Sequence, residues 1–256
     1  DGLASTGVIT PLAGSLITAT ASNGQIYTTT TNAQGYYSFT VPGNYTYTVQ
    51  VGAAPARYGI LVASRTPGGR HESGNAGSYA GRKMTGGTLE IAGNAGSYLG
   101  AGMTGGLIHV SGNAGDNVGA VLPGERFGMA GGTIVVSGNI GARAGDKMRR
   151  GTIIVKGNTG PGAGTRMVGG TIWAEGSLGA DPGFMMRRGT LIAPKVERLL
   201  PTFVDCGRHD LLIARILSRA LQKELGGLAP KPLPVVVRKI GGDMATIGRG
   251  EILLPG

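Results

Sequence analysis

The stretch GNIGARAGDKMRRGTIIVK, residues 138–156, carries the pattern that decides the fold. A glycine and an asparagine begin it, glycines recur at its fourth and eighth positions, and a methionine precedes a short apolar run. Its general form is G-[N/S]-x-G-x-x-x-G-x-x-M-x-x-G-[T/L]. Six copies of this form begin at Gly74, Gly93, Gly112, Gly138, Gly157 and Gly176. The intervals between them are 19, 19, 26, 19 and 19 residues, so one copy contains an insertion of seven residues.

Six of the eight methionines keep the same register as the glycines. They are Met84, Met103, Met129, Met148, Met167 and Met186. Because the third methionine is displaced together with the later copies, the insertion lies within residues 121–128, around Leu-Pro-Gly-Glu-Arg-Phe. Stacked copies would place these adaptable side chains inside a narrow core, beside a column of Ile and Val. A soft metal site is the alternative interpretation, but no ladder of Cys or His accompanies the methionines.

Each copy ends in an apolar run that alternates in the manner of a half-buried strand. The runs include Thr88-Leu-Glu-Ile, Leu107-Ile-His-Val, Thr133-Ile-Val-Val, Thr152-Ile-Ile-Val and Thr171-Ile-Trp-Ala. At roughly 3.3 Å per residue, one repeat traces a path of about 60 Å, which suits a flattened coil of a solenoid. A helix-turn-helix repeat needs about 34 residues. The sequence therefore predicts a mainly β protein, built as a single-stranded right-handed parallel β-helix of coils of about 19 residues.

Stacking the coils about 4.8 Å apart would pair each strand in parallel with the strands above and below it. The regularly placed glycines then serve the corners, where positive φ and the close approach of adjacent backbones exclude a side chain. One position of the repeat carries Asn75, Asn94, Asn113, Asn139, Asn158 and, in the last copy, Ser177. Stacked amides at this position predict a hydrogen-bonded ladder along the axis, in preference to a ligand site.

The two ends of the chain lack the repeat. Residues 1–52 are rich in Thr, Ser, Tyr and Val with almost no charge, and segments 25–31, 36–41 and 45–51 read as antiparallel strands. Residues 53–195 form the predicted β-helix, and residues 196–256 form a C-terminal helix and tail. Within residues 209–225 the apolar spacing predicts one amphipathic helix, with Asp210 as N-cap and Gly226 at its end. This helix either covers the open end of the β-helix or packs on a partner subunit.

Composition and charge narrow the classes of partner. Among 256 residues, 50 are glycine, and the formal net charge is +10. This charge favours acidic partners, while an aromatic content of 5% and the lack of a recognisable groove-reading module argue against nucleic acid. The single cysteine, Cys206, excludes an internal disulfide framework and agrees with a reducing, cytoplasmic compartment. No run approaches the roughly 20 apolar residues that span a bilayer, and no signal segment is evident, although a start at Asp1 leaves a cleaved leader open.

The pattern G-x-x-G-x-x-x-G resembles the repeat of the C-terminal β-helix domain of glutamate synthase and of the third subunit of formylmethanofuran dehydrogenases. Residues 74–254 are more similar to the corresponding third subunit, the C subunit, of the bacterial formyltransferase/hydrolase complex. The resemblance is carried by residues 138–153, by Leu200-Pro-Thr-Phe-Val-Asp-Cys-Gly-Arg-His-Asp, and by Gly242-Asp-Met-Ala-Thr-Ile-Gly-Arg-Gly-Glu-Ile-Leu. Residues 1–52 depart from that family and resemble the small sandwich domains appended to surface proteins and carboxypeptidases.

The resemblance implies a non-catalytic structural subunit that acts in the one-carbon metabolism of methylotrophy. Partner subunits of such a complex transfer a formyl group from tetrahydromethanopterin to a methanofuran-like carrier and hydrolyse it to formate. The implied partners are a metal-dependent amidohydrolase subunit, a formyltransferase subunit and a further non-catalytic subunit, and no cofactor is implied for this chain. Two other interpretations stay open. One is an extracellular β-solenoid surface module, indicated by the Thr-rich N-terminal segment, and the other is a glutamate-synthase-like β-helix domain.

Few side chains are spaced for catalysis or for metal binding. Cys206, His209 and Asp210 lie within five residues, but groups so close in a turn entering a helix rarely converge into a catalytic arrangement. His71 and His109 add no metal-ligand spacing, and His109 is expected to point outward from its strand. No carboxylate pair stands out, and no G-x-x-x-x-G-K-[S/T] motif accompanies the glycines. We therefore predict neither a catalytic site nor a metal site.

A basic column near the methionines of successive coils is the candidate binding site, and we name it the basic stripe. Its members are Arg82, Lys83, Lys147, Arg149, Arg150, Arg166, Arg187 and Arg188. Guanidinium groups favour carboxylates, so an acidic partner surface is one candidate ligand. The polyglutamyl tail of the furan carrier, which the family resemblance implies, is another. A solvated corner that merely aids solubility is an equal alternative.

Overall fold

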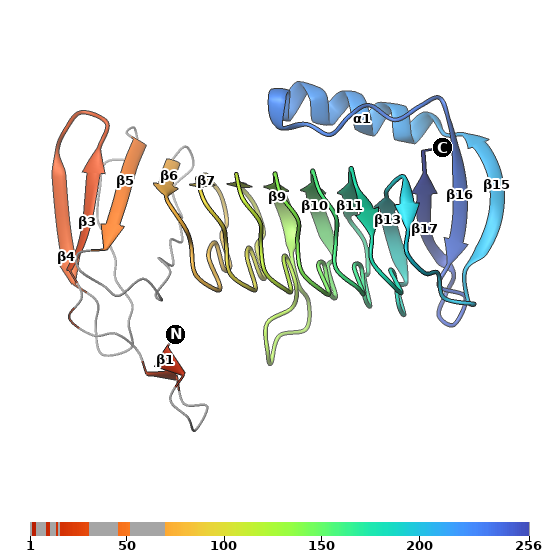
Figure 1. The fold of residues 1–256 in the computed structure, drawn as a ribbon, viewed down its shortest axis with the longest axis horizontal. Coiled ribbons are helices and arrows are strands. Elements are labelled where there is room, and N and C mark those ends of the chain that lie inside the picture. The colour runs from red at the N-terminus through yellow and green to blue at the C-terminus, as the bar shows by residue number, and fades with distance from the viewer. Residues whose placement is uncertain are drawn as a thin grey trace.

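The structure is a computed structural model, and it describes residues 2–3, 9–10, 14, 16–30, 46–51 and 70–255. Figure 1 shows a row of similar coils, each contributing a strand. These strands are β6 (Arg70–Ser73), β7 (Thr88–Ile91), β8 (Leu107–Val110), β9 (Ala130–Val136), β10 (Arg150–Val155), β11 (Thr171–Ala174) and β13 (Arg188–Ile192). The N-terminal part contains β1 (Gly2–Leu3), β2 (Ile9–Thr10), β3 (Leu16–Ala21), β4 (Ile26–Thr30) and β5 (Thr46–Val51). The C-terminal part contains β12 (Ser177–Leu178), β14 (Lys195–Val196), β15 (Val204–Asp210), α1 (Leu212–Leu225), the 3-10 turn η1 (Gly226–Leu228), β16 (Val236–Gly242) and β17 (Arg249–Leu254).

Most of the described strands belong to one mixed sheet. Its order is β15-β16-β17-β13-β11-β10-β9-β8-β7-β6-β5-β3-β4, and the short pairs β1–β2 and β12–β14 lie outside it. Within the described residues the fold is thus mainly β with a single α-helix, as the sequence predicts.

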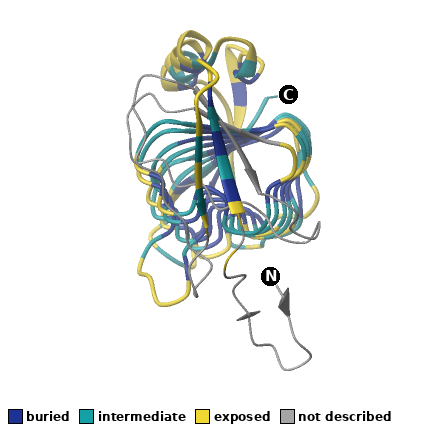
Figure 2. Ribbon diagram, turned by 90° about the vertical axis from the view of Figure 1, so that its left-hand side faces the viewer, coloured by how far each residue is buried: buried dark blue, intermediate teal, exposed yellow. Residues whose placement is uncertain are grey.

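Consecutive coils pair in parallel at the interval of the repeat. Thr88 lies opposite Leu107, which lies opposite Thr133, and the pairing continues through Thr152 and Thr171. A second line of parallel bridges joins Ala76, Ala95, Ala114, Ile140 and Thr159. Each coil therefore meets the next along two separate lines. Viewed along the row, the coils superpose on one another (Figure 2).

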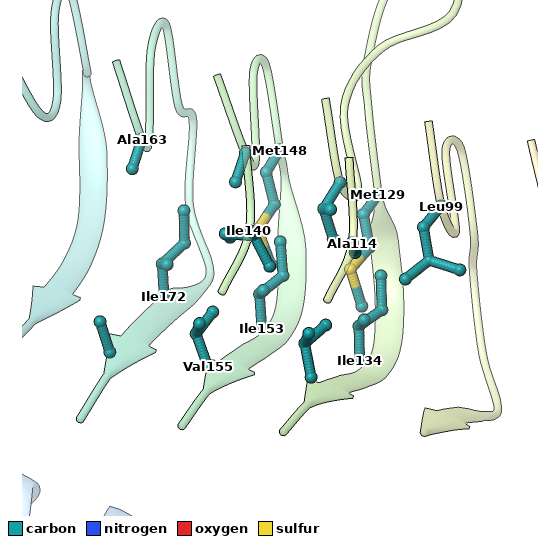
Figure 3. Packing of buried hydrophobic residues seen from close by; sticks show 14 of the residues in the cluster. Leu99, Ala114, Met129, Ile134, Ile140, Met148, Ile153, Val155, Ala163 and Ile172 are labelled. Carbon is teal, nitrogen blue, oxygen red and sulfur yellow. The ribbon is translucent and has the colours of Figure 1, made fainter. Parts of the chain in front are cut away.

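The inner side of the coils is a continuous apolar core. On β8, Ile108 and Val110 are fully buried, whereas the alternate residues Leu107 and His109 are half-buried. The predicted inward column of methionines is confirmed, because all six have 1% exposure or less. In Figure 3, Met129 and Met148 pack among the branched side chains of neighbouring coils. This core is the result of the period-two pattern repeated in register.

Each inner methionine reaches over a glycine of the following coil. A Cβ atom at Gly151 would lie 2.7 Å from the methyl carbon of Met129 and 2.8 Å from the carbonyl oxygen of Gly132. Gly151 also has φ of +98°, a conformation that residues with side chains rarely adopt. Met103 meets Gly132 in the same manner. Each of these glycines therefore leaves the space that the methionine of the preceding coil fills.

The predicted asparagine ladder is confirmed, although its bonds differ from those expected. Asn75 Oδ1 accepts a hydrogen bond from the backbone N–H of Asn94 at 2.8 Å, and Asn94 Oδ1 accepts one from Asn113. The series continues through Asn139, Asn158 and Ser177. Each side chain thus binds the main chain of the next coil and not its amide group. A Cβ at Gly93 would lie 2.0 Å from Asn75 Oδ1, so the first glycine of a repeat makes room for the preceding asparagine.

Antiparallel strands close the C-terminal end of the row. β17 extends the parallel series by pairing with β13, and β16 and β15 then add to it in antiparallel order. Asp243, in the connection between β16 and β17, accepts hydrogen bonds from the backbone N–H groups of Met185 and Ala245, both at 2.9 Å. The last coil is therefore tied to this closing hairpin.

Helix α1 lies across the outer side of the strands (Figure 1), not over their open end. Its residues Ala214 and Leu221 pack in one buried cluster with outward residues of the sheet. Those sheet residues are Val135, Ile154, Trp173, Ile192 and Leu253. A helix of 14 residues measures about 21 Å, which matches the width of five neighbouring strands, about 19 Å.

The start of α1 corrects a detail of the prediction. Leu211 is the N-cap and makes no side-chain capping bond, whereas Asp210 ends β15 and pairs with Arg215 at 3.0 Å. Asp210 is not the N-cap because strand pairing with Val236 holds it in the sheet. Gly226 ends the helix with φ of 55°, as predicted.

The N-terminal strands are antiparallel where the structure describes them. β3 pairs with β4 and with β5, which confirms the predicted strands at 25–31 and 45–51. The predicted strand at 36–41 lies outside the described residues. β5 pairs in parallel with β6, so one sheet runs from the N-terminal strands into the coils.

Candidate functional site

The insertion, residues 122–128 and hereafter the insertion loop, projects from the coil of β9 away from α1 (Figure 1). Between this loop and the neighbouring coils on both sides lies an open pocket of about 400 Å³. Its wall includes Tyr98, Glu125, Arg143, Lys147 and Arg166, with Leu122 and Pro123 from the loop. Other coils lack the insertion, so the pocket is a feature of one place in an otherwise repeating row.

A buried carboxylate holds the cations of this pocket. Asp146 is 4% exposed. It accepts hydrogen bonds from Arg143 Nη2 at 2.8 Å and from Arg166 Nε at 2.9 Å, and Arg166 Nη2 also donates to it. Donating these hydrogen bonds to Asp146 raises the pKa of the Arg166 guanidinium. The two guanidinium groups are thereby fixed by one shared anion, while Lys147 forms no side-chain ion pair among the described residues.

Several pocket residues occupy a left-handed backbone conformation. Tyr98 has φ of 60°, Arg143 of 57° and Lys147 of 53°. Residues other than glycine pay a conformational cost there, which is about 1–2 kcal/mol for most side chains. Glycine stands at an equivalent corner as Gly162 or Gly102, but most other coils carry side chains there, including Tyr79, Asp181 and Met185, also with positive φ. The left-handed conformation is therefore a property of the repeat at these corners.

The members of the basic stripe lie in several different environments. Lys147 and Arg166 line the pocket. Lys83 donates to Glu125 Oε1 of the insertion loop at 2.6 Å, and this hydrogen bond lowers the pKa of Glu125. Arg149 stacks over the ring of Phe127 at 5.2 Å. The remaining members are Arg82, which is half-buried, and Arg150, Arg187 and Arg188, which are exposed.

Sequence reasoning missed several residues of the pocket, including Tyr98, Arg143 and Asp146. Arg143 lies five positions before Met148, outside the neighbourhood of the methionines that defines the stripe. Asp146 interrupts the run of cations and carries the opposite charge, so the stripe does not include it. The signal that points to them is the insertion itself, because a longer coil creates space beside its neighbours.

The residues considered for catalysis do not converge. Cys206, His209 and Asp210 lie on the exposed edge strand β15, and not in a turn as the sequence suggested, because β15 pairs with β16. His209 Nε2 lies 2.8 Å from the carbonyl oxygen of Cys206, and the Cys206 thiol contacts the carbonyl oxygen of Val204. His109 points outward as predicted, with Nε2 3.3 Å from Ser137 Oγ. Among the described residues no group of three or more His, Cys, Asp or Glu is placed to hold a metal ion.

The outer face of α1 is a second candidate surface. Leu212 is 62% exposed, Ile213 65% and Ile216 52%, although the opposite face of the helix is buried on the sheet. Arg219 and Lys223 are also exposed. Such an amphipathic arrangement with an apolar outer side is typical of a protein-binding helix. No helix in the described part of the chain has the length and apolar character to cross a membrane.

Comparisons with known proteins find similarity to one characterised complex. No family model matches the sequence. The C subunit of the formyltransferase/hydrolase complex Fhc, from Methylorubrum extorquens (strain AM1), is 44% identical over 57 residues, which are 22% of this chain and 21% of that protein. A chain in the crystal structure of the formyltransferase/hydrolase complex (FhcABCD) from Methylorubrum extorquens in complex with methylofuran has a TM-score of 0.70 and 41% identity. That match covers 77% of this chain and 76% of the other.

Proposed function

This chain belongs to the family of the C subunits of formyltransferase/hydrolase complexes, and from that premise we propose that it is a structural subunit of such a complex. The multi-subunit nature of the related assembly supports this role. In the proposal, the chain has no catalysis of its own. Its work is to offer a rigid body to which other subunits attach.

The rigid body is a single-stranded parallel β-helix in this proposal, with residues 53–195 as its central unit. Parallel pairing at the interval of the repeat supports the assignment, as do the second line of bridges and the shared inner core. We take its hand to be right, as in the prediction from the sequence. Residues 1–52 and 196–256 are the appended units. A stack held along two lines resists bending, which suits a part that fixes distances between subunits.

The observation that carries the proposal is the exposed apolar face of α1. Leu212, Ile213 and Ile216 together expose large side chains on a helix that is anchored to the sheet by its other side. Burying such side chains contributes about 1.5–3 kcal/mol each. The neighbouring Arg219 and Lys223 would complement acidic groups around an apolar groove. We therefore assign this face to a partner subunit.

The partners in this proposal are an amidohydrolase subunit, a formyltransferase subunit and a further non-catalytic subunit. These partners transfer the formyl group from tetrahydromethanopterin to a methanofuran-like carrier and hydrolyse it to formate in one-carbon metabolism. The metal belongs to the amidohydrolase subunit. The cytoplasm is the proposed compartment, because the exposed thiol of Cys206 suits a reducing environment.

The basic stripe is a second contact region in the proposal. Its exposed members include Arg150, Arg187 and Arg188, which lie where β10 and β13 begin and are therefore spaced along the row of coils. Exposed guanidinium groups at such spacing suit the carboxylates of an acidic partner surface or of the carrier tail. Their contribution should weaken as salt is raised, since exposed charges are screened.

Co-purification tests the assignment of the α1 face. The variant Ile213→Glu, expressed with the partner subunits, should lose most of the complex because the new carboxylate would be buried without a partner. Native mass spectrometry of the purified assembly counts and identifies the chains that remain. Ile26→Glu is the matched control, because Ile26 on β4 is 62% exposed and far along the sheet from α1.

Two results would contradict the proposal. Equal recovery of complex with Ile213→Glu and with Ile26→Glu would remove the α1 face from the interface. Formyl transfer or hydrolysis by the isolated chain would reject a purely structural role.

A further inference from the structure

We propose that the pocket beside the insertion loop is a binding site for a small molecule that carries a carboxylate or phosphate group. The site consists of Arg143, Lys147 and Arg166 with Tyr98 as a wall. This goes beyond the proposed role in assembly, and it concerns a ligand and not a subunit. Only two members of the basic stripe belong to it.

The first argument is the charge that remains after internal pairing. Three cations line the pocket together with two carboxylates, Asp146 and Glu125. Glu125 is paired with Lys83, a cation from outside the wall. Asp146 neutralises only one of the two guanidinium groups that share it, so an excess of two positive charges faces the pocket. An anion is therefore the complementary ligand.

The second argument is that the donors are held in place before any ligand arrives. Asp146 is buried and accepts two hydrogen bonds from Arg166, which orient that guanidinium group, and one from Arg143. Oxyanions bind well to such prearranged N–H donors because little side-chain freedom is lost on binding. The free ammonium group of Lys147 adds a third cation beside them.

The third argument is the shape of the pocket. A volume of about 400 Å³ is within the range of sites for small organic ligands. Leu122 and Pro123 supply apolar wall on the side of the insertion loop, and Tyr98 supplies another wall, with its ring stacked on Tyr79 at 4.9 Å. An apolar wall beside convergent cations strengthens the attraction for an anionic group, because less water screens it.

Isothermal titration of the purified chain with citrate and, separately, with inorganic phosphate tests the site. The buffer is held at fixed ionic strength, since a basic protein attracts anions without specificity. We expect saturable binding of at least one probe, at one site per chain. Stronger binding of citrate identifies a polycarboxylate ligand, and stronger binding of phosphate identifies a phosphorylated one.

Two variants separate a binding role from a structural one. Lys147→Gly and Arg143→Gly should each weaken binding of the preferred probe by about tenfold or more, because each removes one charged donor. The variant Lys147→Gly should unfold at the wild-type temperature or above it, since Gly102 occupies the equivalent position with φ of 66°. Arg188→Gln, which removes an exposed charge outside the pocket, is the matched control and should leave affinity unchanged.

Either of two results would overturn the proposal. One is the absence of saturable binding of both probes by the wild-type chain. The other is an equal loss of affinity in Arg188→Gln and Lys147→Gly, which would indicate attraction to the overall charge. Binding that fails only in the two pocket variants, with their folding intact, would support the site.

Discussion

The outer side of the parallel strands differs between the first coils and the later ones. On β7 and β8 the outward residues Glu90 and His109 are half-buried and polar. On β9, β10 and β11 the residues in register with them are Val135, Ile154 and Trp173, and all are buried under α1. The inner side shows no such change, because its branched residues and methionines are buried throughout.

This difference shows that the repeat specifies the inner side and leaves the outer side free. An inner residue is enclosed by its own coil and by two neighbours, so its size and polarity are constrained in every copy. An outer residue is constrained only by whatever packs on it. Apolar outer residues therefore mark the strands that a helix covers, and polar ones mark the strands that face solvent. Four predictions, each with its own variants, test this comparison.

The largest effect is expected for Trp173→Ala, which acts where the outer side is covered. Trp173 is 3% exposed in the cluster beneath α1, and losing a buried Trp costs about 3–5 kcal/mol. His109→Ala, at a register-matched position on the uncovered part, should cost about 0.5 kcal/mol or less. Urea unfolding followed by circular dichroism measures both. Similar losses in the two variants would abolish the distinction between covered and uncovered strands.

On the inner side, Gly151→Ala should cost about 2–3 kcal/mol, through positive φ and overlap with the Met129 methyl group. The carbonyl oxygen of Gly132 also blocks the new Cβ atom, so a shift of the methionine alone does not relieve the clash. Gly74→Ala is the control, because a Cβ atom there would meet nothing within 4 Å. The midpoint of urea unfolding checks the pair. A mild effect at Gly151 would mean that the inner side adapts as readily as the outer one.

Asp243→Asn tests how firmly the covered end of the row is closed, with an expected loss of about 1–2 kcal/mol at neutral pH. Burial alone would raise the pKa of the Asp243 carboxyl. The hydrogen bonds that it accepts, including those from the Ala245 and Met185 amides, together lower the pKa by more than burial raises it, so the net shift is downward. The folded state thus favours the charged form, so this stabilisation is present above the unfolded pKa, near 3.8, and is lost as pH falls below it. Wild type and variant should keep their difference in thermal melts above about pH 5 and approach each other as the pH falls from about 4 to about 2. A constant gap over that range would exclude the carboxylate charge as its cause.

Apart from the control variants, the smallest effect is expected at the exposed asparagine ladder. Asn113→Ala removes the acceptor for the backbone N–H of Asn139 and should cost about 0.5–1 kcal/mol. Asn113→Asp retains an oxygen acceptor and should recover most of this loss. Hydrogen exchange at the Asn139 amide reports the bond directly. Unchanged exchange in Asn113→Ala would show that the ladder does not protect the main chain.

Much of the fold follows from local pattern. The inward methionines, the strands at each apolar run and the asparagine ladder are all predictable, because each arises from one position repeated in register. The site was harder to predict. Asp146 carries no signal in a sequence of mixed charges, and its pairing with Arg166 joins residues 20 positions apart in neighbouring coils. The position of α1 also could not be read from its own sequence, since an amphipathic helix fits an open end as well as the side of a sheet.

The sequence by itself determined the interval of the coils, the residues that face inward and the presence of one insertion. It did so because strands whose side chains alternate with a period of two, and which recur every 19 residues, bury their apolar side chains in only one stacking register. Only the tertiary structure decided where α1 lies and what the insertion encloses. Both depend on surfaces assembled from several coils at once, and no single repeat contains enough of such a surface to specify what will pack against it.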